Sequence, residues 1–183
     1  GLLDKQGTLL ANPYHYRDRR TDGMLDEAFR RMPRERIFEL TGIQFMQLNS
    51  LYQLLSMVVS QSPILKIAET FLTMPDLFNF WLTGQVACEF SNATTTQCYD
   101  PRQRAWAEPL LQAMGIRRRI FPRVIPPGTV LGRVCPAVSE ETGASQVVVI
   151  APACHDNGSA VAAVPAQGRD FAWISSGTWS IMG

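Results

Sequence analysis

Several features that identify common classes of protein are missing from this sequence. No apolar stretch approaches the roughly 20 residues that a membrane-spanning helix needs, so we expect no membrane contact. The 17 basic and 16 acidic residues nearly balance, and no basic run is longer than residues 117–119, which argues against nucleic-acid binding. With two histidines and no Cys-x-x-Cys pair, the sequence also predicts no metal site of the zinc type.

The motifs of several enzyme classes are absent as well. Neither the P-loop pattern G-x-x-x-x-G-K-[ST] nor the Rossmann pattern G-x-G-x-x-G occurs. His155 and Asp156 are adjacent, whereas the members of a hydrolase triad rarely neighbour each other in sequence, and no G-x-S-x-G elbow accompanies them. Cys154 has no feature beside it that would make it a nucleophile, so we expect a small buried cysteine. A hydrolase is therefore disfavoured.

The composition is that of a folded domain. Apolar residues make up 46% of the 183 positions and charged residues 18%, which is enough for a sizeable core in one domain or slightly more. The four cysteines are scattered along the chain, as is typical of a reducing compartment, so we expect a cytoplasmic protein.

Apolar residues recur at helical spacing through the first two thirds of the chain, and we interpret them as core. One predicted helix begins near Thr21, and the others cover residues 33–42, 49–60, 63–72, 75–84 and 106–114. A polar stretch at residues 91–97 separates the last two of these helices. Residues 121–136 are rich in proline, which predicts a loop with short extended pieces.

The last third of the chain has a different pattern. Residues 146–151 form a β-branched run that predicts a strand buried on both faces of a sheet. A small-residue helix over 159–164 and a strand over 171–175 follow. Strands interspersed with helices predict an α/β fold.

Asp156 lies just beyond the predicted strand at 146–151 and just before the helix. Ligands of open α/β sheets bind outside the carboxyl ends of strands, so its carboxylate is placed to accept a proton from a substrate hydroxyl. Aspartate is also a preferred N-cap residue, and from position alone capping is the commoner role. Spacing does not separate these two interpretations.

The turn at residues 175–178 (Ser-Ser-Gly-Thr) is a second candidate. A strand that leads into a turn rich in glycine and hydroxyl groups presents N–H and O–H donors to a phosphate. An ordinary hairpin turn has the same composition and is commoner, so both interpretations stay open.

A series of short motifs, taken together and in this order, resembles the FGGY family of carbohydrate kinases. The motifs are GLLD at 1–4, YRDRRT at 16–21, TGIQF at 41–45, NSLYQL at 49–54, MPDLF at 74–78, WLTG at 81–84, SNATTTQ at 91–97, PGTVLG at 127–132, HD at 155–156 and SSGTWS at 175–180. Each motif is weak by itself, but the ordered series covers essentially the whole chain.

The resemblance implies an α/β fold of two ribonuclease H-like (actin-like ATPase) lobes with the substrates in the cleft between them. Residues 1–166 then correspond to the N-terminal lobe without its opening strands, and residues 167–183 to the start of the nucleotide-binding lobe. We therefore expect an internal fragment that is inactive alone. The implied reaction of the full-length protein is transfer of the γ-phosphoryl group of ATP, with Mg²⁺, to a ketose.

The resemblance also implies roles for particular residues. Asp156 matches the catalytic base, and Thr178 with Gly177 matches a nucleotide contact. The positions that match the sugar pocket are His155, Asn157, Tyr16, Gln44 and Asn49.

Details of two motifs favour L-rhamnulose as the sugar, with L-rhamnulose 1-phosphate as the product. One departure concerns Asn157, where threonine is expected in the kinases of that sugar. L-fuculose or xylulose therefore remains an alternative substrate, and a non-catalytic sugar-binding remnant remains an alternative to an enzyme.

Overall fold

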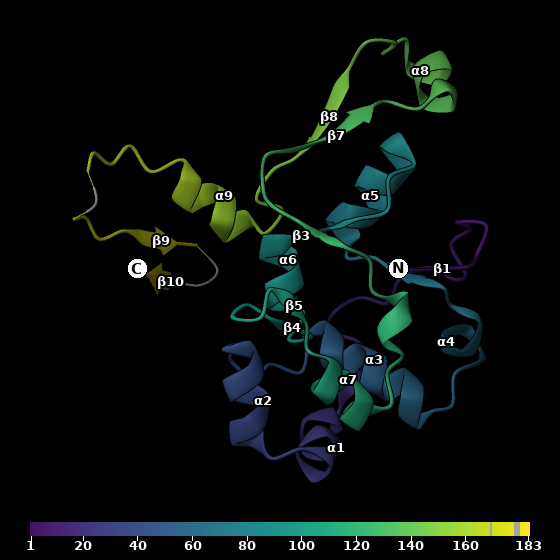
Figure 1. Cartoon of the computed structure of the whole chain (residues 1–183), viewed down its shortest axis with the longest axis vertical. Coiled ribbons are helices and arrows are strands. Elements are labelled where there is room, and N and C mark those ends of the chain that lie inside the picture. Colours follow the sequence, from purple (N-terminus) through teal and green to yellow (C-terminus); the bar gives the residue numbers. More distant parts are fainter. Residues whose placement is uncertain (169, 178–179) are drawn as a thin grey trace.

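The computed structural model describes residues 1–168, 170–177 and 180–183 (Figure 1). The α-helices are α1 (Met24–Arg31), α2 (Arg34–Thr41), α3 (Ser50–Val59), α4 (Pro63–Ile67), α5 (Met74–Thr83), α6 (Phe90–Thr95), α7 (Glu108–Met114), α8 (Pro136–Thr142) and α9 (Asp156–Ala162), with 3₁₀ turns at Arg19–Thr21 and Arg118–Ile120. The strands are β1 (Leu2–Leu3), β2 (Thr70–Phe71), β3 (Cys88–Glu89), β4 (Tyr99–Asp100), β5 (Ala105–Trp106), β6 (Val124–Ile125), β7 (Thr129–Arg133), β8 (Val148–Ala151), β9 (Ile174–Ser176) and β10 (Ser180–Met182).

The main hydrophobic core lies among the helices at one end of the molecule, where α1 packs against α3 and α7 (Figure 1). Helix α3 supplies Leu51, Tyr52 and Leu55, each fully buried, and α7 supplies Leu110 and Leu111. These positions belong to the apolar stripes that the sequence predicts as core, so that prediction is confirmed.

Glycine ends two of the predicted helices where the sequence places them. Gly42 follows α2 with φ of +66°, and Gly84 follows α5 with φ of +73°. Both lie in the left-handed region, which costs glycine little because it has no Cβ.

The described strands pair two by two. The β3–β6 pair is parallel, with Cys88 opposite Val124, and the β1–β2, β4–β5, β7–β8 and β9–β10 pairs are antiparallel. The β1–β2 pair joins Leu2 to Phe71, and so the start of the chain is held against the segment that precedes α5.

The β-branched run at 146–151 forms a strand, but its predicted burial is wrong. Strand β8 pairs with β7, and Val147, Val148 and Ile150 are each about half exposed. Among the described residues, β8 has one neighbouring strand, and α5 packs against the hairpin without covering all of its side chains.

Two predicted helices are shorter than the periodicity indicates. The helix from Pro63 ends at Ile67, because Thr70 and Phe71 pair with β1 instead. The predicted start of another helix at Trp106 is also wrong, since this residue belongs to β5 opposite Tyr99 and the helix begins at Glu108. In both cases a strand pairing replaces a helical turn, with the distant β1 in the first case and with the neighbouring β4 in the second.

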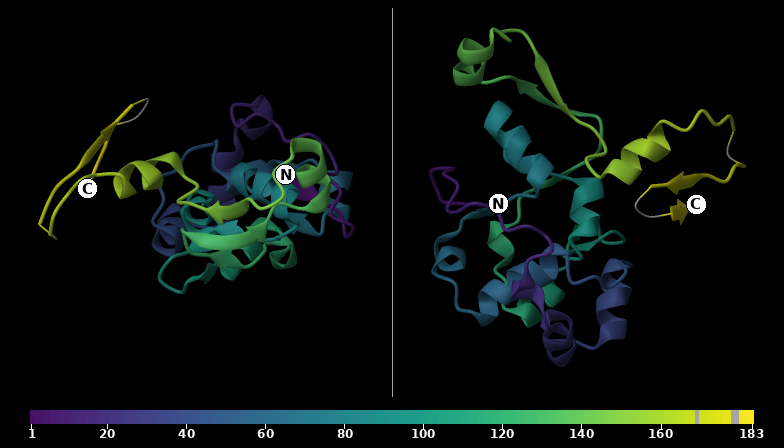
Figure 2. Two further views of the ribbon diagram at one scale, coloured as in Figure 1. Left: turned by 90° about the horizontal axis from the view of Figure 1, so that it is seen from above. Right: turned by 180° about the vertical axis from the view of Figure 1, so that it is seen from behind.

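Two parts of the chain extend away from the helical body. The β7–β8 hairpin with α8 forms one extension, and α9 with the β9–β10 hairpin forms the other (Figure 2). Helix α6 lies beside α9 where the second extension leaves the body (Figures 1 and 2). No helix in the described part of the chain combines the length and apolarity that crossing a bilayer requires.

Asp76, at the start of α5, is a buried carboxyl group that should make stability depend on pH. It accepts hydrogen bonds from the Thr73 hydroxyl at 2.5 Å and the Glu89 N–H at 3.0 Å. Burial nevertheless raises its pKa above the ordinary 3.8, and the charge of Glu89 adds to this effect. The folded protein therefore holds this proton more tightly than the unfolded chain does.

We expect the stability that Asp76 contributes to be largest at low pH and to be lost as the pH rises through its raised pKa. The difference in free energy of unfolding between wild type and Asp76→Asn should therefore shrink as the pH rises. Urea unfolding of the full-length protein at a series of pH values measures this difference. The control is Asp26→Asn, because Asp26 is an exposed aspartate. A difference that does not vary with pH would contradict the assignment.

Candidate active site

The His155–Asp156–Asn157 triplet lies where β8 leads into α9. Ala151, the last residue of β8, is fully buried, and residues 152–155 connect it to the helix. The strand thus fixes where the triplet begins, and α9 fixes the direction in which it continues. Of the residues that the sequence analysis selected, these three are brought together by the local fold.

The carboxylate of Asp156 is not an N-cap. His155 holds the N-cap position of α9, Asp156 is the first helical residue, and no side-chain cap bond forms. Asp156 accepts a hydrogen bond from the N–H of Asn157 at 2.8 Å, and His155 Nδ1 lies 3.4 Å from the same Oδ1 atom. Its side chain is 94% exposed, so the carboxylate is open to a substrate.

Glu89 and Ser91, from a distant part of the sequence, form hydrogen bonds with the backbone of the connection that precedes Asp156. The carboxylate of Glu89, fully buried, accepts the N–H of Cys154 at 3.0 Å. The hydroxyl of Ser91 accepts the N–H of His155 at 2.9 Å and itself donates to Glu89. The backbone of Cys154 and His155 is therefore tied to the segment around β3 and α6.

The predicted polar stretch at 91–97 is a structured element rather than a separator. Residues Phe90–Thr95 form α6, and the Glu89 carboxylate caps it by accepting the N–H groups of Ser91 at 2.9 Å and Asn92 at 3.4 Å. The sequence reasoning missed Glu89. The signal for it is a lone acidic residue placed just before a run of small polar residues, which is an N-terminal capping pattern.

Gln44 and Asn49 form a second group, in the connection between α2 and α3. The Asn49 amide donates to the backbone oxygen of Gln44 at 3.2 Å and to the side-chain oxygen of Gln97 at 3.1 Å. Asn49 is 3% exposed, so this network holds the loop between α2 and α3. Gln44 is exposed, which leaves its own side chain available to a ligand.

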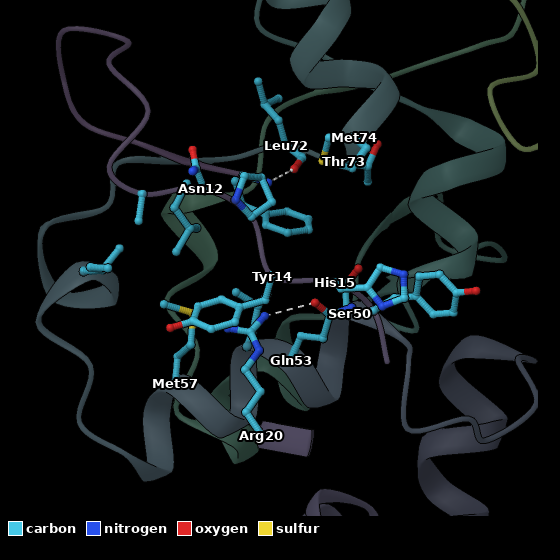
Figure 3. Close-up of a pocket in the computed structure, with 18 residues that line it drawn as sticks. Asn12, Tyr14, His15, Arg20, Ser50, Gln53, Met57, Leu72, Thr73 and Met74 are labelled. Carbon is cyan, nitrogen blue, oxygen red and sulfur yellow. Dashed lines mark hydrogen bonds between the residues drawn. The ribbon is translucent and has the colours of Figure 1, made fainter. Parts of the chain in front are cut away.

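Tyr16 lies apart from both groups, at a cavity of about 500 Å³ (Figure 3). The guanidinium of Arg20 lies 4.1 Å from the centre of the Tyr14 ring and donates to Gln53 at 3.0 Å, as Figure 3 shows. Tyr16 is 44% exposed, and none of the other selected site residues lines this cavity.

The predicted phosphate turn begins at the end of β9, which pairs with β10 in an antiparallel hairpin with Ser176 opposite Ser180. Gly177 is exposed, and Thr178 lies outside the described residues. The hairpin touches the triplet, because the Ser175 hydroxyl lies 3.5 Å from the side-chain oxygen of Asn157. Gly177 and the proposed base are thus on neighbouring elements, since α9 packs against β9.

The thiol of Cys154 lies directly before the triplet. Burial raises the pKa of Cys154 to about 11, and the charges of Glu89 and Asp76 add to this, so its thiol stays protonated and is a poor nucleophile. In the part of the chain that the structure describes, no group of three or more His, Cys, Asp or Glu side chains is placed to hold a metal ion.

In open α/β sheets, ligands bind outside the carboxyl ends of strands, where Asp156 lies, and comparison with known proteins identifies the family. The profile described as "FGGY family of carbohydrate kinases, N-terminal domain" matches residues 1–163. The chain therefore belongs to the FGGY family of carbohydrate kinases.

Curated relatives match over the full length of the chain. A rhamnulokinase of Oceanobacillus iheyensis and one of Bacteroides thetaiotaomicron are each 42% identical over 182 residues, which is 100% of this chain and 38% of each relative. The chain thus spans somewhat over a third of the length of these relatives.

Solved structures of more distant proteins share the fold. Gluconate kinase from Lactobacillus acidophilus matches with a TM-score of 0.75 and 20% identity, over 82% of this chain and 31% of that one. Glycerol kinase from Plasmodium falciparum, solved with ADP, matches with a TM-score of 0.72 and 18% identity over the same shares of the two chains. The chain has the ribonuclease H-like, actin-like ATPase fold of these kinases, as the resemblance of its motifs implies.

Proposed function

We propose that the full-length protein transfers the γ-phosphoryl group of ATP to a hydroxyl of L-rhamnulose, giving L-rhamnulose 1-phosphate in L-rhamnose catabolism. The observation that carries the proposal is the exposed carboxylate of Asp156, which follows the connection from β8 at the first residue of α9. Family membership and the names of the relatives support the reaction class and the sugar.

In the proposed reaction, Asp156 acts as the general base. The sugar hydroxyl oxygen attacks the γ-phosphorus, the bond from that phosphorus to the β,γ-bridging oxygen breaks, and ADP leaves. The hydroxyl proton passes to the carboxylate of Asp156 as the new bond forms, and water removes it afterwards. The exposure of this carboxylate allows a hydroxyl to approach within hydrogen-bond distance.

The neighbouring side chains are proposed to bind the sugar. His155 and Asn157 flank Asp156 and offer imidazole and amide groups to hydroxyls, as a polar lining of a sugar pocket requires. Gln44, which is exposed in the loop between α2 and α3, and Tyr16, which lines the separate cavity, are proposed as further sugar contacts. Asn49 is proposed to act through the loop that carries Gln44, since its own amide is buried and engaged.

The nucleotide is proposed to bind beside the β9–β10 turn, with Gly177 and Thr178 as contacts. The lobe boundary is proposed near residue 166, close to the end of the family match at residue 163. ATP is expected as its Mg²⁺ complex. The described residues form no metal cage, and no step above passes through a metal held by this chain.

A turnover assay tests the function. We expect the full-length protein to phosphorylate L-rhamnulose with a higher kcat/KM than L-fuculose or D-xylulose when the three are compared at equal ATP. Turnover of another sugar alone would keep the family and reject the substrate. A folded protein with no turnover of any sugar would favour a non-catalytic, sugar-binding role.

A further inference from the structure

A fully buried carboxylate lies next to the proposed catalytic loop, and the mechanism above does not use it. Glu89 is 0% exposed, and in the described part of the chain no lysine or arginine is close enough to pair with it. Burying a charge is costly unless hydrogen bonds replace the lost water. Here the replacement comes from N–H and O–H groups alone.

The contacts of Glu89 divide between two segments that are far apart in sequence. One oxygen accepts the N–H of Ser91, and the other accepts the Ser91 hydroxyl, the N–H of Asn92 and the N–H of Cys154. A shorter cap such as aspartate or serine would satisfy the helix as well. The length of the glutamate side chain is what allows the second oxygen to reach Cys154, 65 positions further along the chain.

Ser91 makes the next contact along the same loop. Its hydroxyl donates a hydrogen bond to Glu89 and accepts one from the N–H of His155 at 2.9 Å, so Glu89 and Ser91 together form a hydrogen-bonded bracket that holds the loop. The first turn of α9 also lies against Ser91. A Cβ added to Gly158 would be 3.6 Å from the Ser91 Cβ and 3.0 Å from the Ala153 Cβ, which leaves no room for a larger residue without movement.

We propose that Glu89 and Ser91 are positioning residues that fix the backbone of Cys154 and His155 and thereby set where the Asp156 carboxylate meets the sugar hydroxyl. This inference rests on the proposed function. Neither side chain is placed to touch the substrate, since both contact the loop from the side of α6. Their effect on the reaction passes through the loop, and a displacement of about 1 Å at a reacting group can cost about a hundredfold in rate.

Two substitutions in the full-length protein remove the bracket in different ways. Glu89→Gln keeps the shape but turns one acceptor oxygen into an N–H donor that faces other donors. Ser91→Ala removes the hydroxyl that joins Glu89 to His155. Thr95→Ala is the matched control, because its hydroxyl lies on the same helix but bonds only to the backbone oxygen of Asn92.

We expect both bracket variants to lower kcat about 10- to 100-fold, with the KM for ATP within about threefold of wild type. Each variant is assayed below its melting transition, so loss of folded protein does not contribute. Amide hydrogen exchange of a peptide that covers residues 153–157 should become about tenfold faster or more, while exchange in α3 stays unchanged. Thr95→Ala should leave both measurements at the wild-type level.

The two measurements separate failure of this inference from failure of the proposed function. Wild-type exchange at residues 153–157 in both bracket variants would overturn the inference, and so would faster exchange together with a kcat within twofold of wild type. If the wild-type protein phosphorylates no sugar, the proposed function fails. The exchange measurement then decides by itself whether Glu89 and Ser91 hold the loop.

Discussion

Replacement of Asp156 by asparagine should lower kcat by about 10²–10⁴-fold, the usual range for loss of a general base. Asparagine has nearly the same shape and still accepts the N–H of Asn157, so the start of α9 should not change. An amide does not take up the hydroxyl proton, however, and the attacking oxygen then has no acceptor for it as the bond to phosphorus forms. The effect therefore belongs to the chemical step.

Sugar binding should survive the same substitution. The proposed contacts from His155 and Asn157 remain, so the dissociation constant for the sugar, measured by calorimetry, should stay within a few-fold of wild type. Asp26→Asn is the matched control, because Asp26 is an exposed aspartate in the first turn of a different helix, α1. An Asp156→Asn protein that keeps its kcat within about tenfold of wild type would rule out this residue as the base.

Replacement of Trp106 by alanine should produce the largest loss of stability, about 3–5 kcal/mol in the free energy of unfolding. Its ring is 4% exposed and lies 4.7 Å from the ring of Phe121 and 5.5 Å from that of Tyr99, measured between centroids. Its indole N–H donates to the backbone oxygen of Pro122 at 2.7 Å. Truncation removes the aromatic packing and the hydrogen bond together.

Trp106→Phe separates these two contributions. It keeps an aromatic ring in the core but leaves the Pro122 oxygen without its partner, so we expect a smaller loss of about 1–3 kcal/mol. Urea unfolding followed by circular dichroism measures both variants. If the alanine variant lost less than about 1 kcal/mol, Trp106 would not be part of the core of this lobe.

The sequence predicted those elements that local rules determine. Pro33 precedes α2 and Gly42 ends it, and Asn49 precedes α3, as the residue preferences at helix ends indicate. The errors fall where strand pairing decides the outcome, either with the neighbouring β4, as at Trp106, or with a distant segment. Periodicity extends the helix that begins at Pro63, but the pairing of Thr70 and Phe71 with β1 ends it. No feature of residues 63–72 indicates that part of this segment pairs with a strand almost 70 positions earlier in the chain.

The candidate site divides in the same way. The triplet at 155–157 follows from a strand, a short connection and a helix, all of which are readable locally. The role of Glu89 cannot be predicted locally, because its contact with Cys154 depends on how β3 and α6 pack beside the β8–α9 connection. Whether Asp156 is an N-cap also needed the structure, since a shift of one residue in the helix start decides which residue holds the cap position.

The β7–β8 hairpin has a consequence for handling the protein. Residues 146–151 are uncharged and free of proline, and residues 147–150 are all β-branched. The side chains of Val148 and Ile150 are about half exposed on a strand with a single described neighbour. Such a segment is a template for strand addition by a second molecule, and self-association through it grows with concentration. When the lobe is prepared by itself, a charged substitution at Val148, the first residue of β8, would act as a gatekeeper against aggregation.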